Sequence, residues 1–425
     1  MKTALLFPGQ GSQYIGMGKH LYSNFNCSRD IYDTANEILG LDLKKLCFEG
    51  NIKELTKTEN VQPAILTTSI AAYEAYINNG GILPICVAGH SLGEYSALVA
   101  SGILRFEDAL RLVRKRGILM MKAANHSTKG VMAAIRNVDI KKIEEMCFDE
   151  SKNDERVVIG NYNSPTQCVI SGCSEAVERV IEKCKIEKDA LITKLNVSSA
   201  FHSPYMQCIA SELGEELKKF SYGKFKFPVI SNVTGEPYKN RYEIVELLKE
   251  QVSKPVNWIS TMKYISKIGC DTAVEISPKN ILKKLVNENT KAIKAYSFDI
   301  EDDIKALYEE QNKISDISEI STMFINKCMV HAVSTCNKNW NEQEYLNGVL
   351  EPYDKMQEIQ RKIEKDGQSI MHEKMIEVFN LLQLIFKTKQ VSIKEQIERL
   401  HEICYETGTE HIYKERIEEM KNQCL

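Results

Sequence analysis

The residues with the clearest chemical potential form the run Gly89-His90-Ser91-Leu92-Gly93, which fits the pattern Gly-x-Ser-x-Gly. An apolar stretch at 85–88 precedes the run, and an apolar helical pattern at 92–100 follows it. In this context the pattern predicts a sharp strand-to-helix turn that exposes the serine hydroxyl as a nucleophile toward carbonyl carbons. The N–H of Leu92 would then lie at a helix N-terminus, where it can donate to an oxyanion. A glycine-rich turn in which Ser91 is only an N-cap is the structural alternative.

A serine hydroxyl needs a base to accept its proton, and the chain offers eight histidines. His202 follows a predicted strand, in the stretch Phe201-His202-Ser203-Pro204. His90 adjoins Ser91, but at a sharp turn the neighbouring side chain points away. The other histidines lie in polar or helical surroundings: His20, His126, His331, His372, His401 and His411. By position His202 is the best candidate base, although a lone histidine is more often structural or solvated.

The segments that must position these residues change in character near residue 300. Residues 1–300 hold 19 of the 22 glycines and 9 of the 10 prolines, which punctuate α/β chains at turns. There, apolar strand-like runs at 3–7 and 85–88 alternate with helical patterns at 62–78, 92–100 and 106–124. This alternation favours a parallel sheet covered by helices.

Residues 130–197 have a different order of elements. Strands are expected at 131–136, 157–160, 168–171 and 191–197, with a turn at Asn163-Ser164-Pro165 and helices at 139–148 and 174–185. The order βαββαβ is typical of a ferredoxin-like unit. Because sheet-like segments resume at 228–231 and 272–275, we expect this unit to be an insertion.

The last part of the chain is helical in pattern. Apolar stripes with helical spacing occur at Met375, Phe379, Leu382 and Phe386 and again at Ile393, Ile397, Leu400 and Cys404, and Gly408 would end the second helix. We therefore expect an α/β fold with a hydrolase-like core at 1–127 and 198–304, a mainly parallel sheet and a nucleophile elbow. The ferredoxin-like subdomain would occupy 128–197, and an all-helical C-terminal extension 305–425.

Composition argues against several functional classes. The formal net charge is −3 with charges of both signs intermixed, so neither nucleic acid nor a membrane surface is an expected partner. The 13 cysteines show no framework of spacings, which predicts free thiols in a reducing compartment. No signal peptide or membrane-length apolar run is evident, so we expect a soluble, cytoplasmic protein. Cys328, His331 and Cys336 have ligand-like spacing, but no fourth ligand follows, so no metal site is expected.

Seven motifs occur in one order over roughly residues 1–300: Phe7-Pro8-Gly9-Gln10-Gly11-Ser12-Gln13, Gly89 to Glu94, Arg116-Gly117, Ala200-Phe201-His202-Ser203, Ser231-Asn232-Val233-Thr234-Gly235, Gln251 with Pro255-Val256-Asn257-Trp258, and Glu275-Ile276-Ser277-Pro278. Together they resemble the malonyl-CoA:acyl-carrier-protein transacylases, including the acyltransferase domains of polyketide and fatty-acid synthases. Ser277 departs from the glycine usual in the last motif, and the resemblance does not cover the chain after about residue 305.

The resemblance implies a role for each matching position. Ser91 would take the acyl group, and His202 would be its base in a Ser–His dyad. A backbone carbonyl at Gln251 would hold the imidazole, which accounts for the absence of an obvious aspartate partner. Gln10 and Leu92 would supply backbone N–H groups to the oxyanion hole. No metal or redox cofactor is expected.

Two further positions concern the acyl group. Arg116 would bind the free carboxylate of a malonyl group, because a planar guanidinium can make two charge-assisted bonds to it. Without the resemblance, a surface charge in the cluster with Arg111, Arg114 and Lys115 is the better interpretation. Phe201 would crowd an α-methyl group and so favour malonyl over methylmalonyl, a preference of ~1–3 kcal/mol for one methyl.

These observations lead to three competing functions. The first is a ping-pong transfer of malonyl from malonyl-CoA to the phosphopantetheine thiol of an acyl carrier protein through malonyl-Ser91. The appended helices and Ala200-Phe201-His202 favour a trans-acting polyketide-synthase acyltransferase over the fatty-acid synthesis enzyme. We expect a monomer, and docking to a synthase through the C-terminal helices stays open. The second is a hydrolase that clears acyl groups from carrier proteins, which Arg116 disfavours. The third is an idle scaffold, which the intact Ser91, His202 and Arg116 disfavour.

Overall fold

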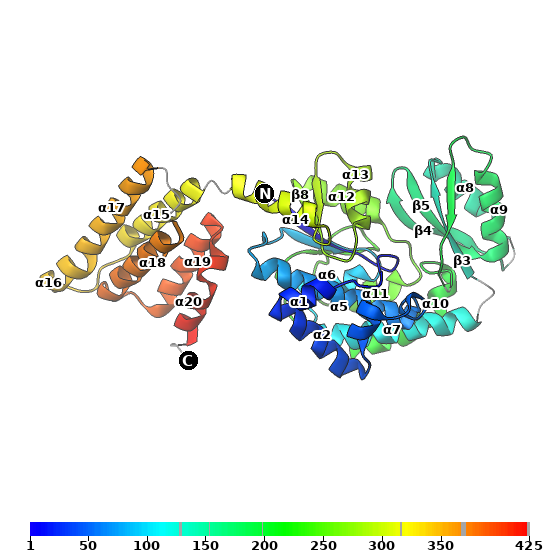
Figure 1. Ribbon diagram of the computed structural model, residues 1–425, viewed down its shortest axis with the longest axis horizontal. Helices are drawn as coiled ribbons and strands as arrows, with labels where there is room; N and C mark the ends of the chain where they lie inside the picture. Colours follow the sequence, from blue (N-terminus) through cyan, green and yellow to red (C-terminus); the bar gives the residue numbers. More distant parts are fainter. Residues whose placement is uncertain (127–129, 153, 198, 315–316, 367–370, 423–425) are drawn as a thin grey trace. The chain divides into compact units, whose positions relative to one another are not determined.

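The computed structural model describes residues 1–126, 130–152, 154–197, 199–314, 317–366 and 371–422 (Figure 1). The chain divides into two compact units, Met1–Leu307 and Tyr308–Leu425. Helix α14 (Glu301–Ile314) runs across this division, so a boundary near residue 305 lies inside a helix rather than in a loop. Of the expected boundaries at 127–128 and 197–198, residues 127, 128 and 198 lie outside the described ones. None of the described helices is long and apolar enough to cross a membrane.

The first unit is built on a five-stranded sheet in which every pairing is parallel. Its order is β7 (Val229–Ile230), β2 (Cys86–Gly89), β1 (Thr3–Phe7), β8 (Thr272–Glu275) and β9 (Lys294–Ser297). The strands β1, β2 and β8 are buried throughout, which explains the mainly apolar sequences of β1 and β2. The expected α/β class with a parallel sheet is confirmed. The edge strand β9 lacks such a run, and the sequence did not predict it.

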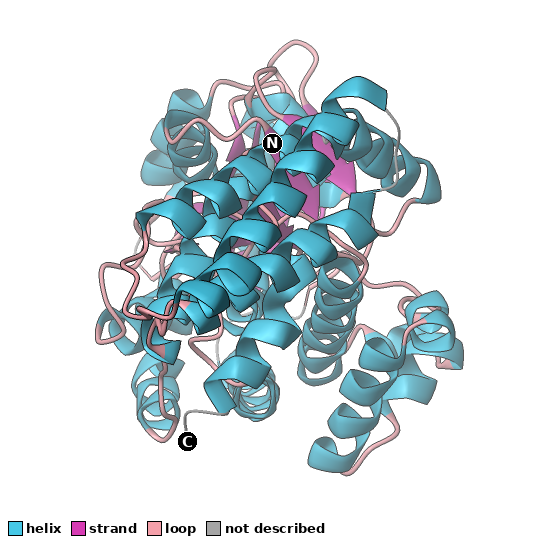
Figure 2. Ribbon diagram, turned by 90° about the vertical axis from the view of Figure 1, so that its left-hand side faces the viewer, coloured by secondary structure: helices cyan, strands magenta, loops and turns pink. Residues whose placement is uncertain are grey.

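Helices, cyan in Figure 2, make up most of the chain. Those that accompany the parallel sheet are α1 (Lys19–Asn24), α2 (Asn26–Leu39), α3 (Leu43–Glu49), α4 (Ile52–Leu55), α5 (Thr58–Asn78), α6 (Gly93–Ala100), α7 (Phe106–His126), α10 (Gln207–Lys218), α11 (Glu243–Gln251), α12 (Trp258–Lys267) and α13 (Ile281–Asn289). Helix α5 is buried along most of its length because it is apolar on nearly all sides. It packs against α7, which carries Arg116.

A second, antiparallel sheet lies within the first unit (Figure 1). Its elements are β3 (Gly130–Arg136), α8 (Ile140–Glu150), β4 (Val157–Ser164), β5 (Gln167–Cys173), α9 (Ser174–Cys184) and β6 (Leu191–Lys194), with strand order β4-β5-β3-β6. Strand β4 runs on to Ser164, so the turn is shorter than the expected Asn163-Ser164-Pro165, and β6 ends three residues before 197. Val256 exchanges backbone hydrogen bonds of 2.9 Å with Gly160 and Tyr162, which tie this sheet to the core.

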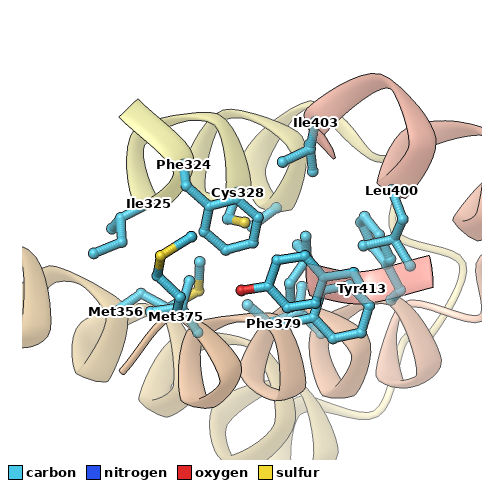
Figure 3. Close-up of a cluster of buried hydrophobic side chains, with 14 of the residues drawn as sticks. Phe324, Ile325, Cys328, Met356, Met375, Phe379, Leu400, Ile403 and Tyr413 are labelled. Carbon is cyan, nitrogen blue, oxygen red and sulfur yellow. The ribbon is translucent and has the colours of Figure 1, made fainter. Parts of the chain in front are cut away.

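The second unit is helical, as expected. It comprises α15 (Ile317–Ser334), α16 (Glu342–Tyr345), a π-helical turn at Leu346–Leu350, α17 (Glu351–Asp366), α18 (Met371–Thr388), α19 (Ile393–Thr407) and α20 (Glu410–Asn422). The α18 stripe is buried in its core, and Gly408 ends α19 at φ 67°. Ile393 is 39% exposed, so the expected α19 stripe is wrong at its first residue. The ring of Tyr413 stacks on Phe324 and Phe379, with centroids 5.0 and 4.5 Å away (Figure 3).

Lys389 stabilises one end of this helical unit. The side chain is only 5% exposed, and its ammonium donates to the carbonyls of Ala332 and Thr335 at 2.7 and 3.0 Å, where α15 ends. Because carbonyls at a helix C-terminus otherwise lack partners, Lys389→Met is expected to destabilise the second unit by ~2 kcal/mol. Hydrogen exchange of the α15 amides in the full chain should become faster. Exposed Lys387→Met is the control, and equal exchange in the two variants would contradict this role.

Candidate active site

Ser91 occupies the turn between β2 and α6, as the sequence predicted. Its φ of 51° lies in the left-handed region, which a serine adopts only when its surroundings impose it. A Cβ on Gly89 would overlap the Gly93 backbone, and one on Gly93 would overlap the Phe7 carbonyl, so both positions require glycine. The helix has no side-chain N-cap, and the Ser91 hydroxyl is bonded elsewhere. The N-cap interpretation of Ser91 is therefore wrong.

His202 lies directly against this hydroxyl. Ser91 Oγ is 2.7 Å from His202 Nε2, and His202 Nδ1 is 2.8 Å from the backbone oxygen of Gln251. A carbonyl can only accept, so Nδ1 carries the proton and donates it, which leaves Nε2 to accept from the serine. The structure thus brings Ser91, His202 and Gln251 together, with the contacts that the family resemblance implies.

The environment of His202 favours the neutral imidazole. Burial, assisted by the positive charge of Arg116, lowers the pKa of His202 to about 3 from its ordinary value of 6.5. The side chain therefore stays unprotonated, and able to accept a proton, as the pH falls below 6.5. We expect the rate at which a fluorophosphonate probe labels Ser91 to hold its neutral-pH value well below pH 6.5. Labelling rates across pH check this, with circular dichroism as the folding control, and an acid limb centred near 6.5 would contradict it.

Two backbone N–H groups next to the nucleophile point to an oxyanion hole. Gln10 and Leu92 both line the same cavity as Ser91. Within the described ranges, neither of their N–H groups donates to a protein acceptor. The loop around Gln10 is held by Lys279, whose ammonium donates to the Gly11 carbonyl at 3.3 Å, and by Ser12, whose hydroxyl donates to the Gly9 carbonyl at 2.8 Å. Unpaired donors held beside a nucleophile can bind a developing oxyanion.

Arg116 is buried, with 1% of its surface exposed, so the surface-charge interpretation is wrong. Its guanidinium donates to the side-chain oxygens of Gln62 and Gln251 at 2.9 and 3.2 Å, and it lies 5.5 Å from the centre of the Tyr95 ring. Burial lowers the pKa of its guanidinium below the ordinary value for arginine. Because its hydrogen-bond partners are neutral amides, the buried cation keeps capacity for an anionic ligand.

The cavity that joins these groups has a volume of about 450 Å³. The parallel-sheet core supplies Gln10, Ser91, Arg116, Phe201 and His202 to its wall, and the antiparallel sheet supplies residues such as Met132 and Val169. The site therefore lies where the two sheets of the first unit meet. No group of metal-ligating side chains is found among the residues described.

Two neighbours of the site show how the sequence fits around it. His90 turns toward the antiparallel sheet, where its Nε2 is 2.9 Å from Asn163 Oδ1, and this position agrees with a side chain that points away from the Ser91 hydroxyl. Ser277, where glycine is usual, donates its hydroxyl to Asp299 at 2.9 Å and is fully buried. The departure is thus accommodated by a hydrogen bond outside the dyad.

Sequence reasoning assigned no role to three residues at the site. Asn232 accepts from the Ser91 N–H, Gln62 accepts from Arg116, and Glu94 is completely buried beside both Asn232 and Gln251. Burial raises the pKa of Glu94 to about 7. Two of them left a signal in the sequence: Glu94 is one carboxylate in the otherwise apolar helical pattern at 92–100, and Asn232 stands in one of the seven motifs. Gln62 left none.

A serine on a strand-to-helix turn, a histidine at hydrogen-bonding distance and two unpaired N–H groups are the features of an α/β enzyme that acts on acyl groups through a serine. The family model described as acyl transferase domain matches residues 4–307. A malonyl CoA-acyl carrier protein transacylase from Bacillus subtilis is 38% identical over 394 residues, covering 93% of this chain and 98% of that protein. Another, from Bacillus subtilis strain 168, is 40% identical and covers 73% of this chain and 99% of its own length.

Solved structures give the same result. The malonyl CoA-acyl carrier protein transacylase from Clostridium perfringens has a TM-score of 0.70 at 36% identity, covering 75% of this chain and all of that one. A malonyl-transacylase solved with a type II PKS acyl-carrier protein has a TM-score of 0.69 at 36% identity, covering 73% of this chain and all of its own. The chain belongs to the malonyl CoA-acyl carrier protein transacylase family.

Proposed function

We propose that this enzyme transfers malonyl from malonyl-CoA to the phosphopantetheine thiol of an acyl carrier protein. The observation that carries the proposal is the buried Arg116 in the same cavity as Ser91 and His202. A site for neutral acyl groups has no use for a buried cation, whereas a free carboxylate could accept hydrogen bonds directly from the guanidinium. The names of the relatives support the same donor and acceptor.

In the first half of the reaction, His202 Nε2 takes the proton of the Ser91 hydroxyl while Oγ attacks the thioester carbonyl. The N–H groups of Gln10 and Leu92 hold the tetrahedral oxyanion; one such donor is typically worth ~3–4 kcal/mol. As the carbon–sulfur bond breaks, the imidazolium returns its proton to the CoA sulfur. Malonyl-Ser91 remains, with its carboxylate on Arg116.

In the second half, the thiol of the carrier's phosphopantetheine arm replaces CoA. His202 accepts the thiol proton, the sulfur attacks the malonyl ester, and the proton returns to Ser91 Oγ as it leaves. One base therefore serves both halves of a ping-pong reaction. The Gln251 carbonyl keeps the imidazole in the tautomer that both steps need.

Phe201 sets the shape of the acyl site in this proposal. Its buried ring lies in the cavity wall one residue before His202. A ring at this place would crowd an α-methyl group, and one methyl discriminates by ~1–3 kcal/mol. The enzyme should therefore prefer malonyl to methylmalonyl without excluding it.

Mass spectrometry of the protein after proteolytic digestion tests the proposal directly. After mixing with malonyl-CoA, a peptide containing Ser91 should gain the mass of one malonyl group, and a purified holo carrier protein should then remove it. An unmodified Ser91 would overturn the mechanism. Release of free malonate faster than carrier loading would favour the carrier-protein hydrolase instead.

We also propose a division of the chain that assigns this chemistry to the first unit. Residues 1–127 and 198–304 would form the hydrolase-like core, 128–197 an inserted ferredoxin-like subdomain and 305–425 the helical extension. Several relatives match over their full length while covering only about three quarters of this chain, which is the share of the first unit. The 394-residue match reaches into the second unit, so that relative shares part of the extension.

We propose that this protein is a monomeric acyltransferase that serves a polyketide synthase in trans, and that the extension docks it to that synthase. Removing residues 308–425 should leave the formation of malonyl-Ser91 unchanged, because the site residues all lie in the first unit. Loading of carrier domains from the cognate synthase should slow, whereas loading of a fatty-acid carrier protein should not. Rates measured with both acceptors check this, and equal effects on the two would contradict a docking role.

A further inference from the structure

Glu94 is a buried carboxylate whose function the dyad does not explain. It lies in the first turn of α6, three residues after Ser91, and is completely inaccessible. Its Oε2 accepts from Gln251 Nε2 at 2.7 Å and from the Asn232 backbone N–H at 3.1 Å, and its Oε1 accepts from the Tyr238 hydroxyl. A charge buried this deeply is costly unless its lone pairs are satisfied, and here amides and a hydroxyl satisfy them.

Asn232, whose backbone N–H donates to Glu94, holds the turn that carries Ser91 through its side chain. Asn232 Oδ1 accepts from the Ser91 N–H, and Asn232 Nδ2 donates to the Gly89 carbonyl, both at 2.6 Å. One side chain therefore bridges the two ends of the turn that keeps Ser91 at positive φ. Glu94 fixes the backbone of this asparagine in turn.

Gln251, the other amide residue bonded to Glu94, connects His202 with Arg116. The Gln251 side chain donates to Glu94 and to the Ser91 carbonyl at 2.9 Å, and it accepts from Arg116. The main-chain oxygen of the same residue accepts from His202. Ser91, His202 and Arg116 are thus each connected to Glu94 through one intermediate residue, Asn232 or Gln251.

The chemistry of a carboxylate determines how the Gln251 amide is turned. Both oxygens of Glu94 accept hydrogen bonds and the Arg116 guanidinium can only donate, so Gln251 presents its NH₂ group to Glu94 and its oxygen to Arg116. A neutral amide at position 94 could accept or donate, and Gln251 could then turn its NH₂ group toward the guanidinium. That orientation would repel Arg116 and displace it from the place where a substrate carboxylate binds.

We propose that Glu94 is the positioning residue of the site: through Asn232 it holds Ser91 in its strained turn, and through Gln251 it aligns Arg116 with the substrate carboxylate. The second half of this inference rests on the proposed function, since it requires a carboxylate-bearing acyl group. The first half concerns only the reactivity of the Ser91 hydroxyl. The two halves therefore have separate readouts.

The main test is Glu94→Gln in the full chain, which keeps side-chain volume. The ratio of kcat/KM for malonyl-CoA to that for acetyl-CoA should fall about 10- to 100-fold, as for loss of a hydrogen bond to a charged group. Labelling of Ser91 by a fluorophosphonate probe should slow as well. Glu275→Gln is the matched control, because Glu275 is equally buried at the end of β8 but accepts from the Lys283 N–H in α13. It should leave the malonyl-to-acetyl ratio unchanged.

A second variant keeps the proposal testable if Glu94→Gln fails to fold. Asn232→Ala should slow fluorophosphonate labelling of Ser91 but keep the malonyl-to-acetyl ratio, since it cuts only the branch to the nucleophile. A wild-type ratio in Glu94→Gln, or wild-type labelling in Asn232→Ala, would overturn the inference. If the wild-type protein labels with the probe but does not accept malonyl, the proposed function fails, and slower labelling of both variants would still support the branch to Ser91.

Discussion

Ser91→Ala is expected to abolish the malonyl adduct and to lower carrier loading by about 10⁴- to 10⁶-fold, as when a covalent nucleophile is removed. The physical reason is that, in the proposed mechanism, His202 takes the proton of Ser91 Oγ, which lies 2.7 Å from its Nε2. Without it, only the oxyanion donors and substrate binding remain. Loading of radiolabelled malonyl onto a holo carrier protein, followed against time, gives the rate.

The dyad also predicts how two changes combine. His202→Ala should be nearly as damaging as Ser91→Ala, and the double variant should lose little more than either single one, because the pair acts as a unit. Thermal unfolding of each variant controls for stability. Full loading by Ser91→Ala, or multiplicative losses in the double variant, would contradict the covalent mechanism.

Arg116→Ala is expected to change which acyl group the enzyme accepts. Removing one partner of a buried, hydrogen-bonded charge pair costs ~2–5 kcal/mol, so kcat/KM for malonyl-CoA should fall by about 30- to 5,000-fold. The acetyl group has no carboxylate for Arg116 to bind, so kcat/KM for acetyl-CoA should fall much less. The preference for malonyl-CoA over acetyl-CoA should therefore narrow or reverse. Steady-state rates with both donors measure the effect.

Controls on the same helix make this result specific. Arg111 lies on α7 with its side chain 53% exposed and near Asp108, so Arg111→Ala should leave the donor preference intact. Arg116→Lys should restore little, because an ammonium cannot reproduce the planar fork of the guanidinium toward a carboxylate. Equal losses with malonyl-CoA and acetyl-CoA in Arg116→Ala would show that the arginine is structural.

The sequence predicted the strand-to-helix turn that carries Ser91 because the signal of this turn is local. A strand, a glycine-bounded turn and a helix lie within residues 85–100, and each can be recognised from its neighbours. The order βαββαβ was visible for the same reason, since short elements follow one another with clear periodicity. Arg116 and His202 required the family resemblance, because neither charge clusters nor lone histidines reveal burial.

The supporting network could not be predicted, because its contacts join distant parts of the chain. Asn232 is 141 residues from Ser91, and Gln251 is 157 residues from Glu94. Which amide faces which partner depends on how the strands and helices pack, and no periodicity encodes that. The edge strand β9 was not predicted for a related reason: it is held by pairing with β8 and has no apolar run of its own.

The bond from His202 to a main-chain oxygen has a consequence for how the enzyme tolerates mutation. Every residue type carries a backbone carbonyl, so no substitution at position 251 deletes the acceptor that sets the imidazole tautomer. A serine hydrolase that relies on an aspartate for this purpose loses it with a single codon change. Here a substitution at position 251 leaves the carbonyl that accepts from His202 in place and changes only the side chain, which contacts Glu94, the Ser91 carbonyl and Arg116. Drift at position 251 should therefore alter donor choice before it abolishes catalysis.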